Sequence, residues 1–167
     1  MQGGLVVMGV AGCGKSSLGA AVAAAQGAVL VEGDEFHSAA NRDKMHRGVP
    51  LTDADRAGWL DELGRQLAMH GARGVVLTCS ALRRSYRDRL RQALPGLRFA
   101  YLELTPAESL ARVQGRGDTH FFSASLVDSQ FATLEPPTGE AGVLRLDATE
   151  PLEVLARCVG EWLGTTP

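Results

Sequence analysis

The octapeptide Gly9-Val10-Ala11-Gly12-Cys13-Gly14-Lys15-Ser16 constrains the fold of this chain more than any other feature. It matches the pattern GxxxxGK[ST], follows an apolar run that begins at Leu5, and precedes a segment rich in alanine that extends to Gln26. A strand, a glycine-rich turn and a helix in this order form a phosphate-binding loop (P-loop), in which backbone N–H groups and the helix N-terminus face an anion. The sequence therefore predicts that residues 9–16, together with Ser17, bind a nucleotide.

Two side chains of this motif have predicted chemical roles. Lys15 places a positive charge at the β- and γ-phosphates, which makes it a candidate catalytic residue for phosphoryl transfer. The Ser16 hydroxyl is placed to ligate Mg²⁺. We therefore expect nucleotide and magnesium to bind together at this loop.

Short apolar runs alternate with longer helical patterns along the rest of the chain. This alternation is typical of βα units, and it predicts an α/β fold with a mostly parallel sheet covered by helices on both faces. Five strands are expected, at residues 5–9, 28–32, 75–79, 99–104 and 143–147. The 167 residues suit a single domain, and the glycine-rich stretch within residues 115–124 suits a small lid.

Composition and charge exclude several classes of partner. Seventeen Lys and Arg against 19 Asp and Glu give a net charge of −2, which provides no basic footprint for nucleic acid or an anionic membrane. Neither a membrane span nor the basic flank of a signal peptide is visible, so a cytoplasmic protein is expected. Three widely spaced cysteines indicate neither a disulfide framework nor a zinc site.

A P-loop is shared by GTPase switches, motor ATPases and small-molecule kinases, so the reaction class needs further signals. Asn41 is the only asparagine and Arg42 follows it, which rules out the guanine-reading NKxD motif. The third predicted strand ends in Thr78-Cys79-Ser80, where a motor ATPase would carry an acidic residue. Both observations favour a kinase.

The second predicted strand delivers carboxylates to the edge of the sheet that carries the P-loop. Asp34 is the candidate base that orients an acceptor hydroxyl and takes its proton, although it can instead cap the following helix. Glu32 is a candidate partner of the Mg²⁺.

Basic side chains supply the remaining candidates. Arg112 and Arg116 lie four residues apart before the predicted lid, where they either close over the phosphates or form a solvated face. His120 follows the lid loop and either contacts substrate or packs beside its aromatic neighbours. Arg83 and Arg87 share a helix face that we expect to meet an anionic substrate.

Four segments together resemble the gluconokinases, a family of P-loop small-molecule kinases. These are GVAGCGKSS at 9–17, EGDEFHSAANRDKMHRGVPLTDADRAGWL at 32–60, CSALRRSYRDRLR at 79–91 and HFFSASLVDSQFATLEPP at 120–137. The resemblance implies Mg·ATP-dependent phosphorylation of D-gluconate to 6-phospho-D-gluconate. It further implies a five-stranded sheet of order 2-3-1-4-5, a lid and a homodimer.

The resemblance also implies roles for individual residues. It places Asp34 at a substrate hydroxyl, and Arg112 and Arg116 at the nucleotide. Further contacts to the sugar acid are implied for His37, Lys44, Arg83, Arg87, His120 and Gln130. The alternatives are a P-loop kinase for another small anionic acceptor, such as shikimate or adenylylsulfate, and an ATP-binding regulator without transferase activity. Polynucleotide phosphorylation is disfavoured by the acidic charge balance.

Overall fold

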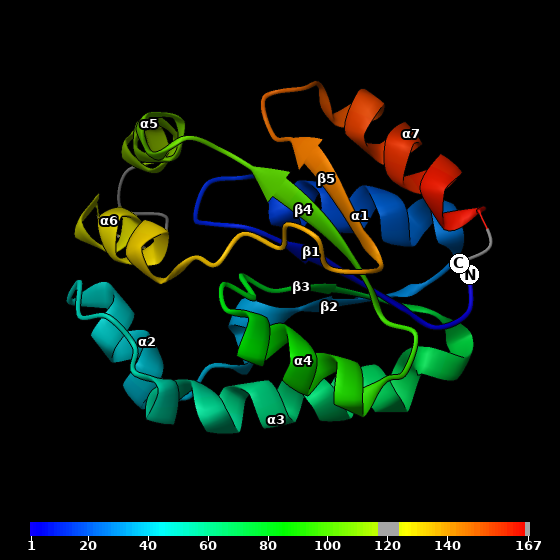
Figure 1. Ribbon diagram of the computed structural model, residues 1–167. Coiled ribbons are helices and arrows are strands. Elements are labelled where there is room, and N and C mark those ends of the chain that lie inside the picture. The colour runs from blue at the N-terminus through cyan, green and yellow to red at the C-terminus, as the bar shows by residue number, and fades with distance from the viewer. Residues whose placement is uncertain (117–123, 166–167) are drawn as a thin grey trace.

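The computed structural model describes residues 1–116 and 124–165. Its centre is one sheet of five parallel strands in the order β2-β3-β1-β4-β5 (Figure 1). The strands are β1 (Gly4–Met8), β2 (Val29–Glu32), β3 (Val75–Thr78), β4 (Arg98–Glu103) and β5 (Val143–Asp147). All five predicted strands are confirmed, each boundary lying within one residue of the prediction, and so is the predicted strand order.

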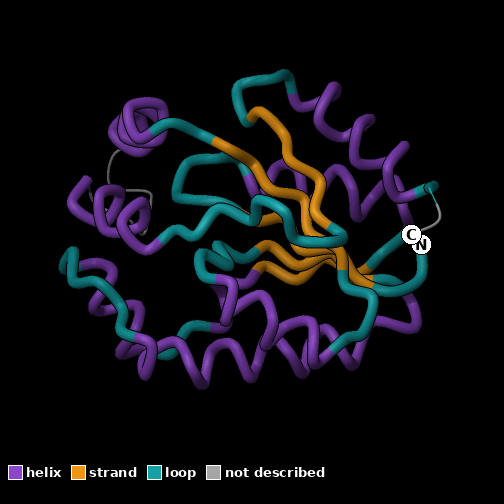
Figure 2. Tube along the Cα trace, in the orientation of Figure 1, coloured by secondary structure: helices purple, strands orange, loops and turns teal. Residues whose placement is uncertain are grey.

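Helices connect the strands and cover the sheet. The α-helices are α1 (Lys15–Gln26), α2 (Ala39–His46), α3 (Asp53–His70), α4 (Arg84–Ala93), α5 (Pro106–Arg116), α6 (Ala124–Thr133) and α7 (Leu152–Leu163). Two short 3-10 turns are η1 (Gly33–Phe36) and η2 (Gly71–Arg73). Figure 2 shows the resulting layers, with the strands between two sets of helices.

The alternation of side chains along β1 explains why both faces of the sheet are covered. Leu5 and Val7 belong to one core cluster with residues of α1 and α7, whereas Val6 and Met8 belong to a second cluster with residues of α3 and α4. All four side chains are fully buried. A strand that is apolar on both faces is stable only between two helical layers, so β1 defines the centre of the domain.

The carboxyl ends of the strands gather at one edge of the sheet, where β1 leads into the P-loop and β2 into η1 (Figure 1). α5 and α6 lie beyond this edge, and Val113 and Val127 pack there against Ala11 of the P-loop. The N-terminus and the last turn of α7 lie at the opposite end of the molecule (Figure 1). In open α/β sheets, ligands bind at the carboxyl edge, so a functional site is expected there.

Most of the predicted lid at 115–124 lies outside the described residues, which resume at Ala124. Within the described ranges, none of the helices combines the length and the apolar character that crossing a membrane requires.

Candidate functional site

The P-loop depends on glycine at three positions. Gly9, Gly12 and Gly14 have φ values of +148°, +78° and +96°, a region that other residues rarely adopt. A Cβ atom at Gly9 would also lie 2.7 Å from the Cys13 Sγ and 2.7 Å from the Leu102 carbonyl oxygen. The glycines of the motif therefore follow from backbone geometry as well as from phosphate recognition.

Residues of α5 and α6 form hydrogen bonds with the P-loop. The backbone N–H of Ala11 donates a 2.6 Å hydrogen bond to the Gln130 Oε1, and the Ser109 hydroxyl donates a 2.6 Å bond to the Ala11 carbonyl oxygen. All three residues are buried. Gln130, which the family resemblance places at the substrate, is thus bonded directly to the loop.

Arg112 lies beside the P-loop. Its guanidinium donates to the carbonyl oxygens of Gly12 and Ala148, at 3.0 and 2.9 Å, so it connects α5 to the loop, and its contact with the nucleotide stays a prediction. The side chains of Arg116 and His120 lie outside the described residues.

Lys15 lies against the loop that precedes it. Its Nζ donates hydrogen bonds of 3.0 and 3.1 Å to the carbonyl oxygens of Gly9 and Val10. The ammonium group is therefore at the mouth of the loop, where a bound polyphosphate would compete with these carbonyl oxygens for it.

A chain of hydrogen bonds connects the P-loop to the ends of β2 and β3. The Ser16 hydroxyl donates to the Glu32 Oε2 at 3.1 Å, and the Thr78 hydroxyl donates to the same oxygen at 2.6 Å. The Thr78 hydroxyl also accepts from the Gly33 N–H at 3.3 Å. A Cβ atom at Gly33 would lie 2.2 Å from the Thr78 carbonyl oxygen, so only glycine fits there.

The Ser16 hydroxyl and the Glu32 carboxylate offer two oxygen ligands that fit Mg²⁺. This ion binds proteins through one or two such groups and takes its other ligands from phosphate and water. Across residues 1–116 and 124–165 the structure contains no cluster of three His, Cys, Asp or Glu side chains that could hold a metal by themselves.

A cavity lies beside the P-loop, between α2, α3 and α6. Its polar lining consists of Asp34, His37, Arg56, Ser80, Ser129 and Gln130. Its apolar lining consists of Met45, Val49, Leu51, Trp59, Leu82 and Leu126. Three of the predicted substrate residues, Asp34, His37 and Gln130, are thus brought together by segments far apart in the sequence.

Asp34 is half-buried in η1 and lines this cavity. The alternative role as a helix cap is not realised, because η1 has no side-chain cap and α2 is capped by Ser38, whose hydroxyl accepts from the Asn41 N–H at 3.1 Å. Burial raises the pKa of nearby Cys79 to about 12, and the charges of Asp34 and Lys15 also act on it.

His37 forms one wall of the cavity. Its ring stacks on Trp59 with 4.1 Å between ring centroids, and the Trp59 indole N–H donates a 2.8 Å bond to the Gly33 carbonyl oxygen. Burial lowers the pKa of His37 to about 4, so the ring is neutral near pH 7. A neutral imidazole suits hydrogen bonding to hydroxyl groups.

Two other predicted substrate residues are placed away from the cavity lining. Lys44 forms a 2.7 Å ion pair with Asp55 at the start of α3. Arg83 is exposed at the N-cap of α4, where its side chain makes no hydrogen bond or ion pair with a described residue.

Arg87 is placed differently from the prediction that it faces a substrate. It is fully buried, and its guanidinium donates to both carboxylate oxygens of Glu140, at 3.0 and 2.6 Å. It also donates to the carbonyl oxygens of Ala81 and Glu135, at 2.8 and 2.9 Å. Ala81 has a φ of +47°, so Arg87 supports a strained loop whose neighbours Ser80 and Leu82 line the cavity.

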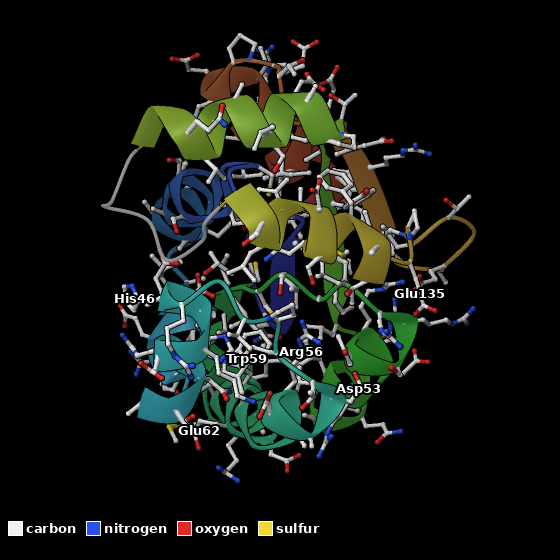
Figure 3. All side chains as sticks on the ribbon, turned by 90° about the vertical axis from the view of Figure 1, so that its left-hand side faces the viewer. His46, Asp53, Arg56, Trp59, Glu62 and Glu135 are labelled. Carbon is white, nitrogen blue, oxygen red and sulfur yellow. The ribbon has the colours of Figure 1, made fainter. Side chains whose placement is uncertain are left out.

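Arg56 is a cavity residue that sequence reasoning missed. Figure 3 shows Arg56 and Trp59 pointing from α3 toward the middle of the molecule, whereas Glu62 points outward. A signal was present in the sequence, because Arg56 precedes Trp59 by three residues and Leu60 by four and therefore lies on the buried stripe of α3. A cation on such a stripe indicates a buried partner or a ligand.

The chain is similar in sequence to known proteins. A family model described as an AAA domain matches residues 5–137. A gluconokinase of Gluconobacter oxydans is 45% identical over 156 residues, which span 90% of this chain and 85% of that protein.

Two solved structures are similar along nearly the whole chain. A gluconokinase from Sinorhizobium meliloti has 45% identity and a TM-score of 0.84, covering 93% of this chain and 87% of that one. A sugar kinase from Janibacter has 38% identity and a TM-score of 0.92, covering 100% of this chain and 97% of that one. With the P-loop, the acidic end of β2 and the adjoining cavity in place, these similarities show that the chain belongs to the gluconokinase family.

Proposed function

We propose that this protein transfers the γ-phosphoryl group of ATP to a hydroxyl group of D-gluconate, giving 6-phospho-D-gluconate and ADP. The observation that carries the proposal is the cavity that holds Asp34 and adjoins the P-loop through Gln130. The gluconokinase relatives support the same reaction, and they do not favour shikimate or adenylylsulfate as the acceptor.

The nucleotide half of the site is formed by the P-loop. Residues 9–17 bind the phosphates through backbone N–H groups other than those of Gly9, Ala11 and Cys13, which donate within the protein. Lys15 neutralises charge that spreads over the γ-phosphoryl oxygens in the transition state. Ser16 and Glu32 would hold Mg²⁺, which supplies further positive charge at the phosphates when it is bound. Arg116 completes this set as a cation before the lid.

The acceptor half of the site is the cavity. The oxygen of the acceptor hydroxyl forms the new bond to the γ-phosphorus while the bond from that phosphorus to the β,γ-bridging oxygen breaks. The hydroxyl proton passes to the carboxylate of Asp34. His37 and Gln130 contact the other hydroxyl groups, because both offer neutral polar atoms in the cavity wall. Lys44, Arg83, Arg87 and His120 remain proposed substrate contacts, of which Lys44 and Arg87 would have to give up the ion pairs described above.

The proposal extends to the whole protein. We propose one domain over residues 1–167 with a lid at about 115–124, a cytoplasmic location and a homodimer, each supported by the family resemblance or the sequence. Light scattering on the purified protein tests the homodimer directly.

The decisive experiment measures ADP release with Mg·ATP and a panel of D-gluconate, shikimate, adenylylsulfate, ribose and no acceptor. Release that depends on gluconate supports the proposal. ADP release that depends only on another acceptor would overturn the proposal. So would ADP release that does not increase with any acceptor of the panel.

Two variants test the mechanism in the same assay. Lys15→Ala should lower kcat by about 10²–10³-fold because it removes a charge from the transition state. Asp34→Asn should lower kcat by about 10²–10⁴-fold while ATP still binds, because only proton transfer and hydroxyl orientation are lost. Glu35→Gln is the matched control, since Glu35 is the exposed neighbour of Asp34 and does not line the cavity. Unchanged turnover in Asp34→Asn would assign Asp34 a structural role.

A further inference from the structure

The cavity contains two formal charges, and their positions suggest how a substrate is oriented. Asp34 supplies a negative charge and Arg56 a positive one, whereas burial keeps His37 neutral near pH 7. The other polar groups of the lining, on Ser80, Ser129 and Gln130, are uncharged. An anionic group of a ligand is repelled by Asp34 and attracted by Arg56, so it binds at the Arg56 side of the cavity.

Arg56 is held by a contact with the neighbouring helix. One of its terminal N–H groups (Nη1) donates a 3.1 Å hydrogen bond to the Tyr86 hydroxyl, and the guanidinium carbon lies 5.4 Å from the centre of the Tyr86 ring. Its other guanidinium nitrogens make no hydrogen bond with any described residue. These remaining donors are free to bind a ligand in the fork geometry that suits a carboxylate.

Tyr86 is itself fixed by a third residue. Its hydroxyl donates a short hydrogen bond to Asp53, which lies one turn before Arg56 on α3. Burial, and after it the hydrogen bond to Asp53, raise the pKa of Tyr86, so the hydroxyl stays protonated. It can therefore donate to Asp53 and accept from Arg56 at the same time, which gives the guanidinium one defined orientation.

We propose that Arg56 binds the carboxylate of the sugar acid and that Tyr86, fixed by Asp53, is the positioning residue that keeps Arg56 aimed into the cavity. The inference rests on the proposed function, and it assigns the two ends of the substrate. The carboxylate lies at α3 and α4, and the hydroxyl that accepts phosphate lies at Asp34 beside the P-loop.

The first test measures binding by calorimetry without ATP. The two ligands are D-gluconate and D-glucitol, which carries a neutral CH₂OH group in place of the carboxylate. Arg56→Gln should weaken gluconate binding by about 10–100-fold, because a charge-assisted pair is lost, and leave the weak binding of glucitol unchanged. Arg56→Lys keeps the charge without the fork, so an intermediate loss is expected.

The second test separates positioning from stability. Tyr86→Phe keeps the ring but removes the hydroxyl that orients Arg56, so the KM for gluconate should rise about 3–10-fold. The kcat and the KM for ATP should stay within about twofold of their original values, a pattern that a general loss of stability does not produce.

Arg89→Gln is the matched control for both tests. Arg89 also connects α4 to α3, through bonds of 3.0 and 2.6 Å to Asp61, but it does not line the cavity. Its replacement should change neither gluconate affinity nor the preference for gluconate over glucitol.

The outcomes separate this inference from the proposed function. Unchanged gluconate affinity in a folded Arg56→Gln or Arg56→Lys variant would overturn the inference, and so would an equal loss of glucitol binding. Selective loss of gluconate binding supports it even if the original protein transfers no phosphate to gluconate, a result that would overturn the proposed function alone.

Discussion

The His37 ring has one defined protonation state, which follows from its contact with Asn41. The Asn41 Nδ2 donates a 2.9 Å hydrogen bond to the Asp55 carbonyl oxygen, which fixes the amide so that its nitrogen also faces the His37 Nδ1 at 3.4 Å. The Nδ1 must therefore accept, and the ring proton lies on Nε2. The neutral His37 ring thus carries its one N–H donor at Nε2.

We predict that His37 makes the stability of the protein depend on pH. Burial lowers the pKa of His37 to about 4, although the charge of Asp34 opposes the shift and those of Arg42 and Arg56 reinforce it. Between pH 6.5 and about 4 the unfolded chain binds a proton at this residue that the folded chain does not bind. The free energy of unfolding therefore falls as the pH drops through this window, by at most about 1.4 kcal/mol per pH unit.

The measurement compares the original protein with His37→Gln by urea unfolding at pH 8, 6 and 5. The difference in unfolding free energy between the two proteins should shift in favour of the variant as the pH falls. Parallel pH profiles would contradict the prediction and would place a charged imidazole in the folded protein.

Single residues differed in how well the sequence predicted them. Asp34 was found because it follows a buried strand whose carboxyl end must meet the P-loop edge. Arg56 was missed although its spacing from Trp59 places it on the buried face of α3, and its orientation depends on Tyr86, which lies 30 positions away on another helix. Local spacing reports the face of a helix, whereas a contact between helices depends on how the whole chain packs.

At the scale of elements, the cap at the start of α3 both stabilises this helix and fixes the turn that carries Arg56, a residue of the acceptor cavity. The Thr52 hydroxyl accepts from the Asp55 N–H at 3.1 Å, and the Asp55 carboxylate accepts from the Thr52 N–H at 2.9 Å, which forms a capping box. This cap fixes the first turn of the helix that carries Arg56.

We predict that Thr52→Ala lowers the free energy of unfolding by about 1 kcal/mol, as loss of a helix cap usually does, and also raises the KM for gluconate. Thr105→Ala is the matched control. Thr105 forms the same reciprocal pair with Glu108, with bonds of 2.9 and 3.2 Å, at α5 on the nucleotide side. It should lose similar stability and leave the KM for gluconate unchanged. Equal changes in both variants would show that the cap of α3 has no specific connection to the acceptor cavity.

The elements themselves were predictable because their cause is local. Apolar runs of the right length gave all five strands, and the glycines of the P-loop gave the turn between β1 and α1. The bracing of that loop by Ser109 and Gln130 was not predictable, since it joins residues more than 90 positions apart.

At the scale of the whole molecule, a buried ion pair connects the segment between α6 and β5 to α4. The Arg87 side chain is fully buried and that of Glu140 is 4% exposed. Burial would raise the pKa of Glu140, but the hydrogen bonds from Arg87 and Arg91 hold it below its ordinary value. The pair also supports the loop at Ala81 that lines the cavity, so it joins distant parts of the fold to the site.

We predict that Arg87→Met lowers the free energy of unfolding by about 3–5 kcal/mol, because it leaves the carboxylate of Glu140 buried without its main partner. The double variant Arg87→Met/Glu140→Leu should recover part of this loss, since no carboxylate then stays buried. Arg89→Gln, which breaks an exposed pair with Asp61, should cost less than about 1 kcal/mol. Urea unfolding of the three variants measures each value. If Arg87→Met cost no more than Arg89→Gln and raised the KM for gluconate instead, Arg87 would be the substrate contact that the family resemblance implies, and the pair with Glu140 would open when substrate binds.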